Sequence, residues 1–268
     1  MKDRTFYTGS NREAWNQAVQ VHQRHLDGKL EKEFAKPGYS ELDDVLTGVW
    51  DSIGLADKDV AHLCCNNGIE LLSTVNLGAK SGMGFDISDV AIEQAKSLAQ
   101  ISGANAEFLR TDIYEIGSAY NNRFDIVMFT VGGLCWLPDL TTVFRLAHDM
   151  LRPSGRLVIY DLHPFTMMLA VPGEKLFSDP FRVEYSYFDN EPIEDNEGID
   201  YIGHTTYDSA TSYDFPHTLA DIFTAIIAAS FAIDRFEEFS HDIANLFSTV
   251  EPKAMVPLSY LLQGRKTT

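Results

Sequence analysis

Short apolar runs alternate with segments of helical periodicity along most of this chain. Such runs fit β-strands, and the continuous run over residues 124–129 is typical of a strand covered on both faces. The strands predicted in this way are 60–65, 81–86, 107–109, 124–129, 156–160, 231–239 and 256–263. Strands that alternate with helices form doubly wound sheets. We therefore expect an α/β protein with a Rossmann-like, seven-stranded, doubly wound sheet, in which the last strand inserts antiparallel.

Helices are predicted between and around these strands. Their expected bounds are 11–32, 41–53, 68–77, 89–102, 140–151 and 218–230. Ser40 and Ser88 are residue types that cap helix N-termini, whereas Gly78 and Gly103 fit helix C-termini. Residues 152–155 have the composition of a turn. The first helix lies ahead of the sheet, where it either packs on the core or forms a lid over a cofactor.

Regular patterning lapses between residues 166 and 213. Alternation within 181–188 and within 199–207 indicates a β-hairpin inserted after the fifth strand. That position suits a substrate cap, and its aromatic residues fit a homodimer interface equally well. We therefore expect one domain over residues 1–268, with an N-terminal helical lid at 1–55 and a β-rich cap at 166–215.

The turn after the first predicted strand carries the first candidate chemistry. Of the three glycines that a pyrophosphate-binding turn uses, only Gly68 is present, because Cys64 and Asn66 occupy the other positions. Asp86 follows the turn by about 20 residues, where such folds place an acid that binds ribose hydroxyls. This combination favours a nucleoside without phosphates, above all S-adenosylmethionine (SAM). A structural turn that binds no nucleotide is the alternative.

Ligand-type residues also follow the next strands. Asp112 comes after the third strand and suits the adenine amino group, although an aspartate there is also a common helix cap. Residues 130–133 end in two glycines, which let the backbone approach a ligand. His163 follows the fifth strand. Because parallel strands end at one edge of the sheet, these positions converge there.

The composition of the chain limits the kinds of partner that we expect. The chain has 21 basic and 39 acidic residues, a net charge of −18, and no basic stripe, which disfavours nucleic acids. No apolar run approaches the roughly 20 residues of a membrane helix. The three cysteines lack zinc-site spacing, so we expect no metal and interpret them as reduced thiols of a cytoplasmic protein.

Several motifs together resemble a known family. They are His62-Leu63-Cys64-Cys65-Asn66-Asn67-Gly68, Gly84-Phe85-Asp86-Ile87-Ser88, Cys135-Trp136-Leu137-Pro138-Asp139-Leu140, Leu151-Arg152-Pro153-Ser154-Gly155 and Asp161-Leu162-His163-Pro164-Phe165. In order and spacing they resemble the class I SAM-dependent methyltransferases, especially a subgroup whose first motif reads His-Leu-x-Cys-x-x-Gly. The resemblance covers essentially the whole chain, but most members of this subgroup have no assigned substrate.

The resemblance implies a set of cofactor-binding residues. They are Trp15, Cys64, Cys65, Asn66, Gly68, Asp86, Ile87, Asp112, Ile113, Thr130 and Val131. Residues 64–68 would follow the methionine part of SAM, Asp86 the ribose, Asp112 with Ile113 the adenine, and residues 130–131 the sulfonium. The sequence departs from the family at His62, which replaces an acid, and at Cys64 and Asn66, which replace glycines.

The acceptor side is less defined. A general base is needed only where the nucleophile must lose a proton, and His163 is our first candidate, because its unperturbed pKa is near neutral. We expect His22, Tyr39, Trp136 and His217 to bind substrate, although each also fits an ordinary core residue. The expected function is methyl transfer from SAM to a small molecule, with S-adenosylhomocysteine (SAH) as product. The alternatives are a SAM- or SAH-binding protein without transfer activity, an NAD-dependent oxidoreductase and a nucleic-acid methyltransferase.

Overall fold

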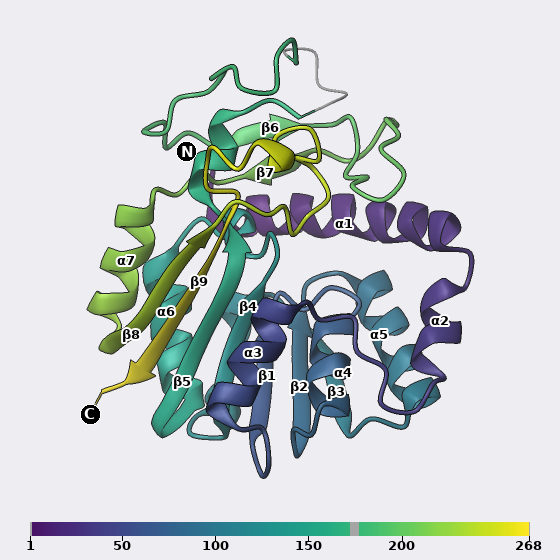
Figure 1. The fold of residues 1–268 in the computed structure, drawn as a ribbon, viewed down its shortest axis with the longest axis vertical. Coiled ribbons are helices and arrows are strands. Elements are labelled where there is room, and N and C mark those ends of the chain that lie inside the picture. Colours follow the sequence, from purple (N-terminus) through teal and green to yellow (C-terminus); the bar gives the residue numbers. More distant parts are fainter. Residues whose placement is uncertain (1, 172–176, 268) are drawn as a thin grey trace.

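Seven strands form one sheet in the computed structural model, which describes residues 2–171 and 177–267 (Figure 1). The strands are β1 (Asp59–Leu63), β2 (Ser81–Asp86), β3 (Ala106–Arg110), β4 (Phe124–Thr130), β5 (Leu151–Leu162), β8 (Phe231–Phe239) and β9 (Ser259–Lys266). Their order is β3-β2-β1-β4-β5-β9-β8. The first five are parallel, and β9 lies antiparallel between β5 and β8. This confirms the predicted fold class.

Helices cover both faces of the sheet. On one face lie α3 (Asp44–Ile53), α4 (Ile69–Asn76) and α5 (Asp89–Ser102), and on the other α6 (Leu140–Met150) and α7 (Leu219–Ala228) (Figure 1). Each face has its own apolar core. Trp50, Leu71 and Ile92 belong to the first, and Phe144 and Ile226 to the second. Burial on both faces explains why the central strands read as continuous apolar runs.

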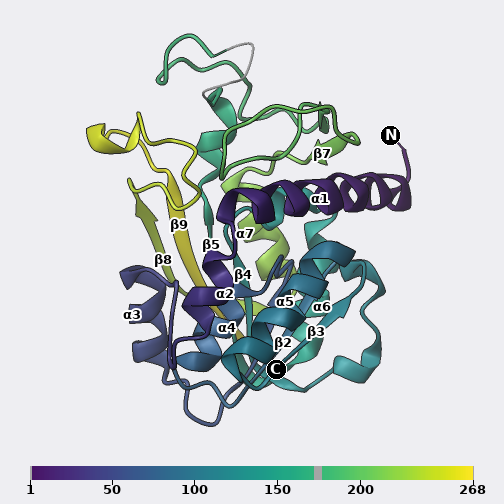
Figure 2. The ribbon, with the colours of Figure 1, turned by 90° about the vertical axis from the view of Figure 1, so that its right-hand side faces the viewer.

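A separate layer covers the carboxyl ends of the strands. The long helix α1 (Arg4–Leu26) lies across these ends, and the short α2 (Lys29–Phe34) descends from it (Figure 2). Above α1 lies the segment inserted after β5, with the two-stranded β6 (Ile193–Asp195) and β7 (Ser212–Asp214). Asn11 of α1 exchanges two hydrogen bonds with the backbone of Tyr213 in β7, at 2.7 and 3.0 Å. Single turns complete the described chain: η1 (Ile113–Glu115), η2 (Ser118–Tyr120), η3 (Leu134–Trp136), η4 (Pro164–Met168) and η5 (Glu251–Lys253).

Several predicted boundaries match the structure. Strand β2, helix α5 with its Ser88 cap and Gly103 end, and strand β8 have the predicted bounds. The final strand, β9, lies three residues beyond the expected 256–263. No helix in the described part of the chain is long and apolar enough to cross a membrane.

Other predictions were wrong in detail. The helix expected at 11–32 begins earlier and breaks at Asp27 and Gly28, whose φ angles of 44° and 70° are left-handed. Helix α3 is capped by Asp43 rather than Ser40. The turn expected at 152–155 lies inside β5, as an irregularity in its pairing with β4.

The insertion also differs from its prediction. Residues 181–188 and 199–207 do not pair with each other as a hairpin. The two strands that pair in the described part of the insertion are β6 and β7. Residues 172–176 of the expected cap lie outside the described residues. The insertion nevertheless lies over the carboxyl edge of the sheet, as the prediction of a cap requires (Figure 1).

Candidate functional site

A pocket of about 710 Å³, partly open to solvent, lies between the carboxyl ends of the central strands and α1. The predicted site residues that line it are Trp15, Cys64, Asn66, Asp86, Ile87, Asp112, Ile113, Val131 and Trp136. Sequence reasoning missed Thr8, Asn11, Phe85, Thr111 and Leu137, which also line it. Residues from α1 and from four strand ends therefore meet in one place.

The loop after β1 bends without the usual glycines. Cys64 and Asn66 have left-handed φ angles of 56° and 48°, and Gly68 has 76°. Asparagine tolerates this region, whereas a β-carbon at Gly68 would lie 2.4 Å from the Phe108 ring. Gly68 does not line the pocket, so the absence of a side chain at this position is needed for packing against Phe108 rather than for ligand contact.

Asp86 joins the loops after β1 and β2. Its Oδ2 accepts a hydrogen bond from the Asn66 backbone N–H at 2.8 Å, and its Oδ1 accepts one from Ser88 at 2.8 Å. Burial raises the pKa of Asp86, and these backbone donors oppose that shift. The carboxyl group also lines the pocket, where its remaining lone pairs are suited to sugar hydroxyls.

Asp112 caps a short helical turn and also lines the pocket. Its Oδ1 accepts a hydrogen bond from Tyr114 N–H at 3.0 Å, so it caps the turn η1. It also lines the pocket together with Ile113, whose side chain is buried. Residues after β2 and β3 thus supply two acids and apolar surface on the same side of the pocket.

The loop after β4 is held by an acid that the sequence analysis did not single out. The Asp161 carboxylate is 3% exposed and accepts hydrogen bonds from the backbone of Gly132, Leu134 and Leu162. It thereby fixes the glycine pair that faces the pocket. A carboxylate directly after a buried strand was the available signal.

Thr130 and His62 lie beneath the pocket rather than in its wall. His62 Nε2 and Thr130 Oγ1 are 2.8 Å apart, and both side chains are buried. Burial lowers the pKa of His62 to about 3, so the imidazole is neutral. His62 therefore joins β1 to β4 without adding charge. Cys65 is fully buried in the core on the α4 face and does not line the pocket either.

Helix α1 closes the pocket from above. Trp15 and Trp136 line it as an edge-to-face pair, with ring centroids 5.2 Å apart. The helix is fixed by an ion pair between Arg12 and Asp89 at 2.7 Å. Asn16 accepts a hydrogen bond from the Ser88 hydroxyl at 2.8 Å. Helix α1 is therefore docked on the N-terminus of α5, over the pocket.

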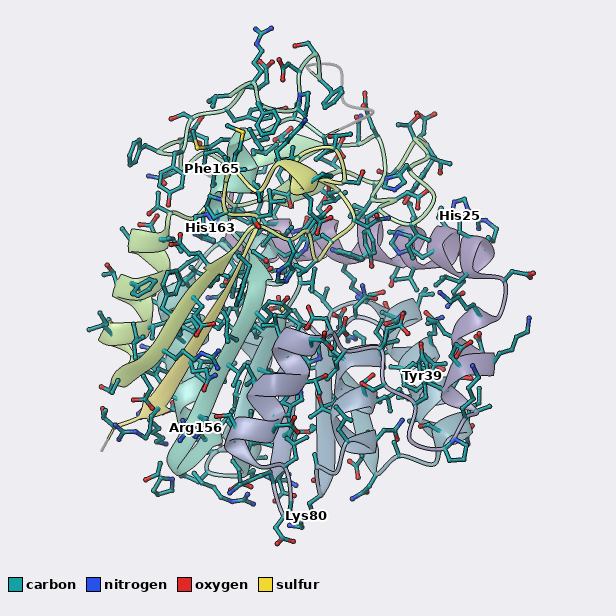
Figure 3. The ribbon with its side chains drawn as sticks, in the orientation of Figure 1. His25, Tyr39, Lys80, Arg156, His163 and Phe165 are labelled. Atoms are coloured by element: carbon teal, nitrogen blue, oxygen red, sulfur yellow. The ribbon has the colours of Figure 1, made fainter. Side chains whose placement is uncertain are left out.

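The other predicted substrate residues do not line the pocket. His22 Nε2 lies 2.9 Å from the Ile199 carbonyl, and His217 Nε2 lies 2.8 Å from the Leu137 carbonyl. Burial lowers the pKa of both histidines. Tyr39 packs on Phe34 beside α2, away from the strand ends (Figure 3).

The predicted base His163 also lies outside the pocket wall. Its Nδ1 accepts a hydrogen bond from Phe165 N–H at 3.0 Å, and its Nε2 lies 2.9 Å from a Glu238 carboxylate oxygen. Figure 3 shows it at the end of the long strands, beside Phe165. Burial lowers the pKa of His163, and Glu238 opposes that shift. His163 is thus held between Phe165 and Glu238, away from the residues that line the pocket.

Comparison with known proteins places this site in a wider group. Residues 60–155 match the methyltransferase domain family. The chain is similar to the tRNA U34 carboxymethyltransferase of Nautilia profundicola, 28% identical over 40% of this chain and 35% of that protein. It is also similar to the ribosomal protein L11 methyltransferase of Hamiltonella defensa, 29% identical over 40% of this chain and 33% of that protein. The chain thus spans less than half the length of these curated relatives.

Solved structures share the fold over most of the chain. An S-adenosylmethionine-dependent methyltransferase from Mesorhizobium loti superposes with a TM-score of 0.59 at 20% identity, over 79% of this chain and 92% of that one. The magnesium protoporphyrin IX methyltransferase of Synechocystis PCC 6803, with SAH bound, gives 0.59 at 16% identity, over 97% and 99%. At these identities the shared property is the fold.

Proposed function

We propose that this chain, which has a methyltransferase domain at residues 60–155 and the fold of class I SAM-dependent methyltransferases, transfers the methyl group of SAM to a small-molecule acceptor. One observation carries the proposal. Asp86 and Asp112 lie at the ends of adjacent strands and line a single pocket together with the bent loop of Cys64 and Asn66. Open α/β sheets bind nucleosides at this edge.

The residues present fit SAM. Lone pairs of the Asp86 carboxylate suit the two ribose hydroxyls, and Asp112 suits the adenine amino group. Ile113 and Leu137 provide apolar surface for the adenine ring. The loop after β1 lacks the glycines of a phosphate site, which agrees with a nucleoside that carries none.

The covering layer supports transfer chemistry. SAM, when bound, supplies an electrophilic methyl group on a positively charged sulfur. The chain must then orient the acceptor and exclude water, since alignment and desolvation account for much of the rate in a displacement of this kind. Trp15 of α1 and Trp136, which follows β4, line the pocket as a pair, and an aromatic face also attracts a cation.

A small acceptor agrees with the charge and with the enclosure. Two relatives are named for tRNA and ribosomal protein acceptors. In contrast, this chain has a net charge of −18, which repels a polyanion such as tRNA at every approach distance within the Debye length. Helix α1 and the insertion also lie over the carboxyl edge of the sheet, where the pocket is, so an acceptor must reach the pocket past them (Figure 2).

Binding of SAM or SAH without transfer is the second candidate. It is favoured by the position of His22, His163 and His217, which in the described structure do not line the pocket. Transfer then requires an acceptor that reacts without prior loss of a proton, or a base other than histidine, because the described residues that line the pocket include no histidine. An acceptor screen separates the two candidates.

The test is incubation with SAM that carries a trideuterated methyl group, in the presence of a small-molecule extract. We expect metabolites whose mass increases by one CD₃ group, and stoichiometric release of SAH, measured by mass spectrometry. Asp86→Ala serves as the inactive control. Labelled tRNA or protein without labelled small molecules would contradict the proposed acceptor class, and SAM binding without any labelled product would favour the second candidate.

A further inference from the structure

Tyr201, in the segment inserted after β5, extends to the loop after β1, which lines the pocket. Its hydroxyl oxygen accepts a hydrogen bond from Asn66 Nδ2 at 3.4 Å. Its ring centroid lies 4.5 Å from that of His22 and 6.5 Å from that of Trp15. Tyr201 therefore contacts both α1 and the loop after β1, although the sequence analysis assigned it no role.

The turn that carries Tyr201 is firmly held. The side chain of the preceding residue, Asp200, is fully buried and accepts hydrogen bonds from the backbone of Gly203 and Thr205 at 2.8 and 3.0 Å. The Thr205 hydroxyl donates a third bond at 2.5 Å, and His25 Nε2 of α1 lies 3.1 Å away. This network fixes the backbone at Tyr201, so the phenol is delivered to one position.

The position of Asn66 defines which end of a ligand it meets. Asn66 follows β1, whereas Asp86 follows β2 and Asp112 follows β3. The strand order is β3-β2-β1-β4. A nucleoside with its ribose at Asp86 and its base toward Asp112 must extend its remaining substituent over β1 and β4. In SAM this substituent is the amino-acid end, so it lies next to Asn66.

We propose that Tyr201 is a positioning residue that holds the Asn66 side chain toward the amino-acid end of SAM, where the amide donates a hydrogen bond to the carboxylate. The proposal rests on the proposed function, since it requires SAM in this pocket. Asn66 Nδ2 has two hydrogens, of which one is directed to Tyr201 and the other is free for a ligand. A side chain that is already fixed loses less conformational freedom on binding.

The chemistry of Tyr201 suits this role. Burial raises the pKa of its phenol, and the nearby Glu70 carboxyl raises it further, so the group stays neutral at every physiological pH. A neutral phenol accepts a hydrogen bond without adding charge beside a carboxylate. The insertion would in this way complete the cofactor site as well as cover it.

The test compares two ligands that differ only at the amino-acid end. Calorimetry measures binding of SAM and of 5′-methylthioadenosine, which has the same nucleoside but no amino-acid group. We expect Tyr201→Phe to weaken SAM binding about five- to tenfold, the usual effect of one hydrogen bond, and to leave 5′-methylthioadenosine unchanged. Tyr207→Phe, which alters a tyrosine of the same insertion that packs on Gly198, should change neither affinity.

A second variant shows whether Tyr201 acts through Asn66. Asn66→Gly removes the side chain, and glycine tolerates the φ of 48° at this position. In that background, Tyr201→Phe should cause no further loss of SAM affinity. Equal losses for both ligands, or a full additional loss in the Asn66→Gly background, would overturn the proposal while leaving the proposed function intact. A wild-type protein that binds neither ligand would overturn both.

Discussion

The floor and the cover of the pocket are held together in different ways. The floor consists of the loops after β1 to β4, and its key contacts involve buried groups, such as the Asp161 carboxylate at 3% exposure. The cover consists of α1 and the insertion. Its ion pair between Arg12 and Asp89 has side chains that are 41% and 45% exposed. Exposed pairs of this kind contribute little stability. We infer that the floor contributes more of the ligand affinity than the cover does, because the ion pair that docks α1 is exposed.

The largest effect is expected from a change that crowds the floor. A β-carbon at Gly84 in β2 would lie 2.5 Å from the Phe108 ring and 2.8 Å from Cys65 Sγ, so these two buried side chains would have to move. We expect Gly84→Ala to lower the free energy of unfolding by about 2–4 kcal/mol. Gly48→Ala in α3, where a β-carbon has open space, should instead be neutral or slightly stabilising. Thermal unfolding of both variants decides this, and similar melting temperatures would show that the floor is less tightly packed.

The next effect concerns ligand affinity. Asp86→Ala removes the carboxylate that faces the pocket and also the acceptor for the Asn66 and Ser88 N–H groups. We expect SAM affinity to fall about 100-fold or more, because two functions are lost together. Calorimetric titration measures it, with Glu107→Ala, an exposed carboxylate on β3, as the matched control. Equal affinities in the two variants would remove Asp86 from the site.

The cover should respond more weakly. Trp15→Ala removes one wall of the pocket and the edge-to-face partner of Trp136, but it leaves every floor residue in place. We expect about a tenfold loss in SAM affinity, with a smaller change in melting temperature than that of Gly84→Ala. A loss as large as that of Asp86→Ala would show that α1 binds the ligand as strongly as the floor does.

One acid, Glu70, is expected to make the stability of the fold depend on pH. Burial raises the pKa of Glu70, at the start of α4, from its usual 4.5 to about 7. The folded protein therefore holds this proton more tightly than the unfolded chain, and stability falls as the pH rises from about 4.5 to 7. Glu70→Gln should be more stable than wild type by about 1–2 kcal/mol at pH 8, with no difference near pH 4. Denaturant unfolding at the two pH values measures it, and an equal difference at both would contradict the assignment.

The smallest effect is expected at His163. Its contacts are to Phe165 N–H and Glu238, and it does not line the pocket. His163→Asn keeps a side-chain acceptor for the turn η4, so we expect transfer rates within about twofold of wild type across pH 6–9. The pH–rate profile of the variant tests this. A lost or displaced limb near neutral pH would restore His163 as the general base.

The sequence predicted the floor well because its signals are local. Ser88 and Gly103 mark both ends of α5 within one segment, and Asp86 follows directly on a strand whose pattern is clear. The capping residue of α3 shows the limit of such signals. Ser40 and Asp43 are equally good caps, but Glu41 N–H binds Ser73 Oγ and Tyr160 binds the Asp43 carboxylate. These tertiary contacts decide where the helix begins.

The cover could not be predicted in the same detail, because long-range contacts define it. Strand β7 is held by Asn11, which lies 202 residues away in the chain, and nothing in residues 212–214 announces that partner. Tyr201 was missed for the same reason. Its contacts to Asn66 and Trp15 join three separate segments. Trp15, which belongs to a helix with a clear periodicity, lines the pocket as that pattern suggested, whereas His22 of the same helix does not.

Both the proposed methyl transfer and the proposed role of Tyr201 require that the pocket beneath α1 binds SAM. Calorimetric titration of the chain of residues 1–268 with SAM and with SAH tests this most directly. We predict one site per chain with a dissociation constant in the micromolar range for both ligands. An absence of heat at millimolar SAM, with no competition by SAH in an independent equilibrium dialysis, would contradict the account and leave only the fold.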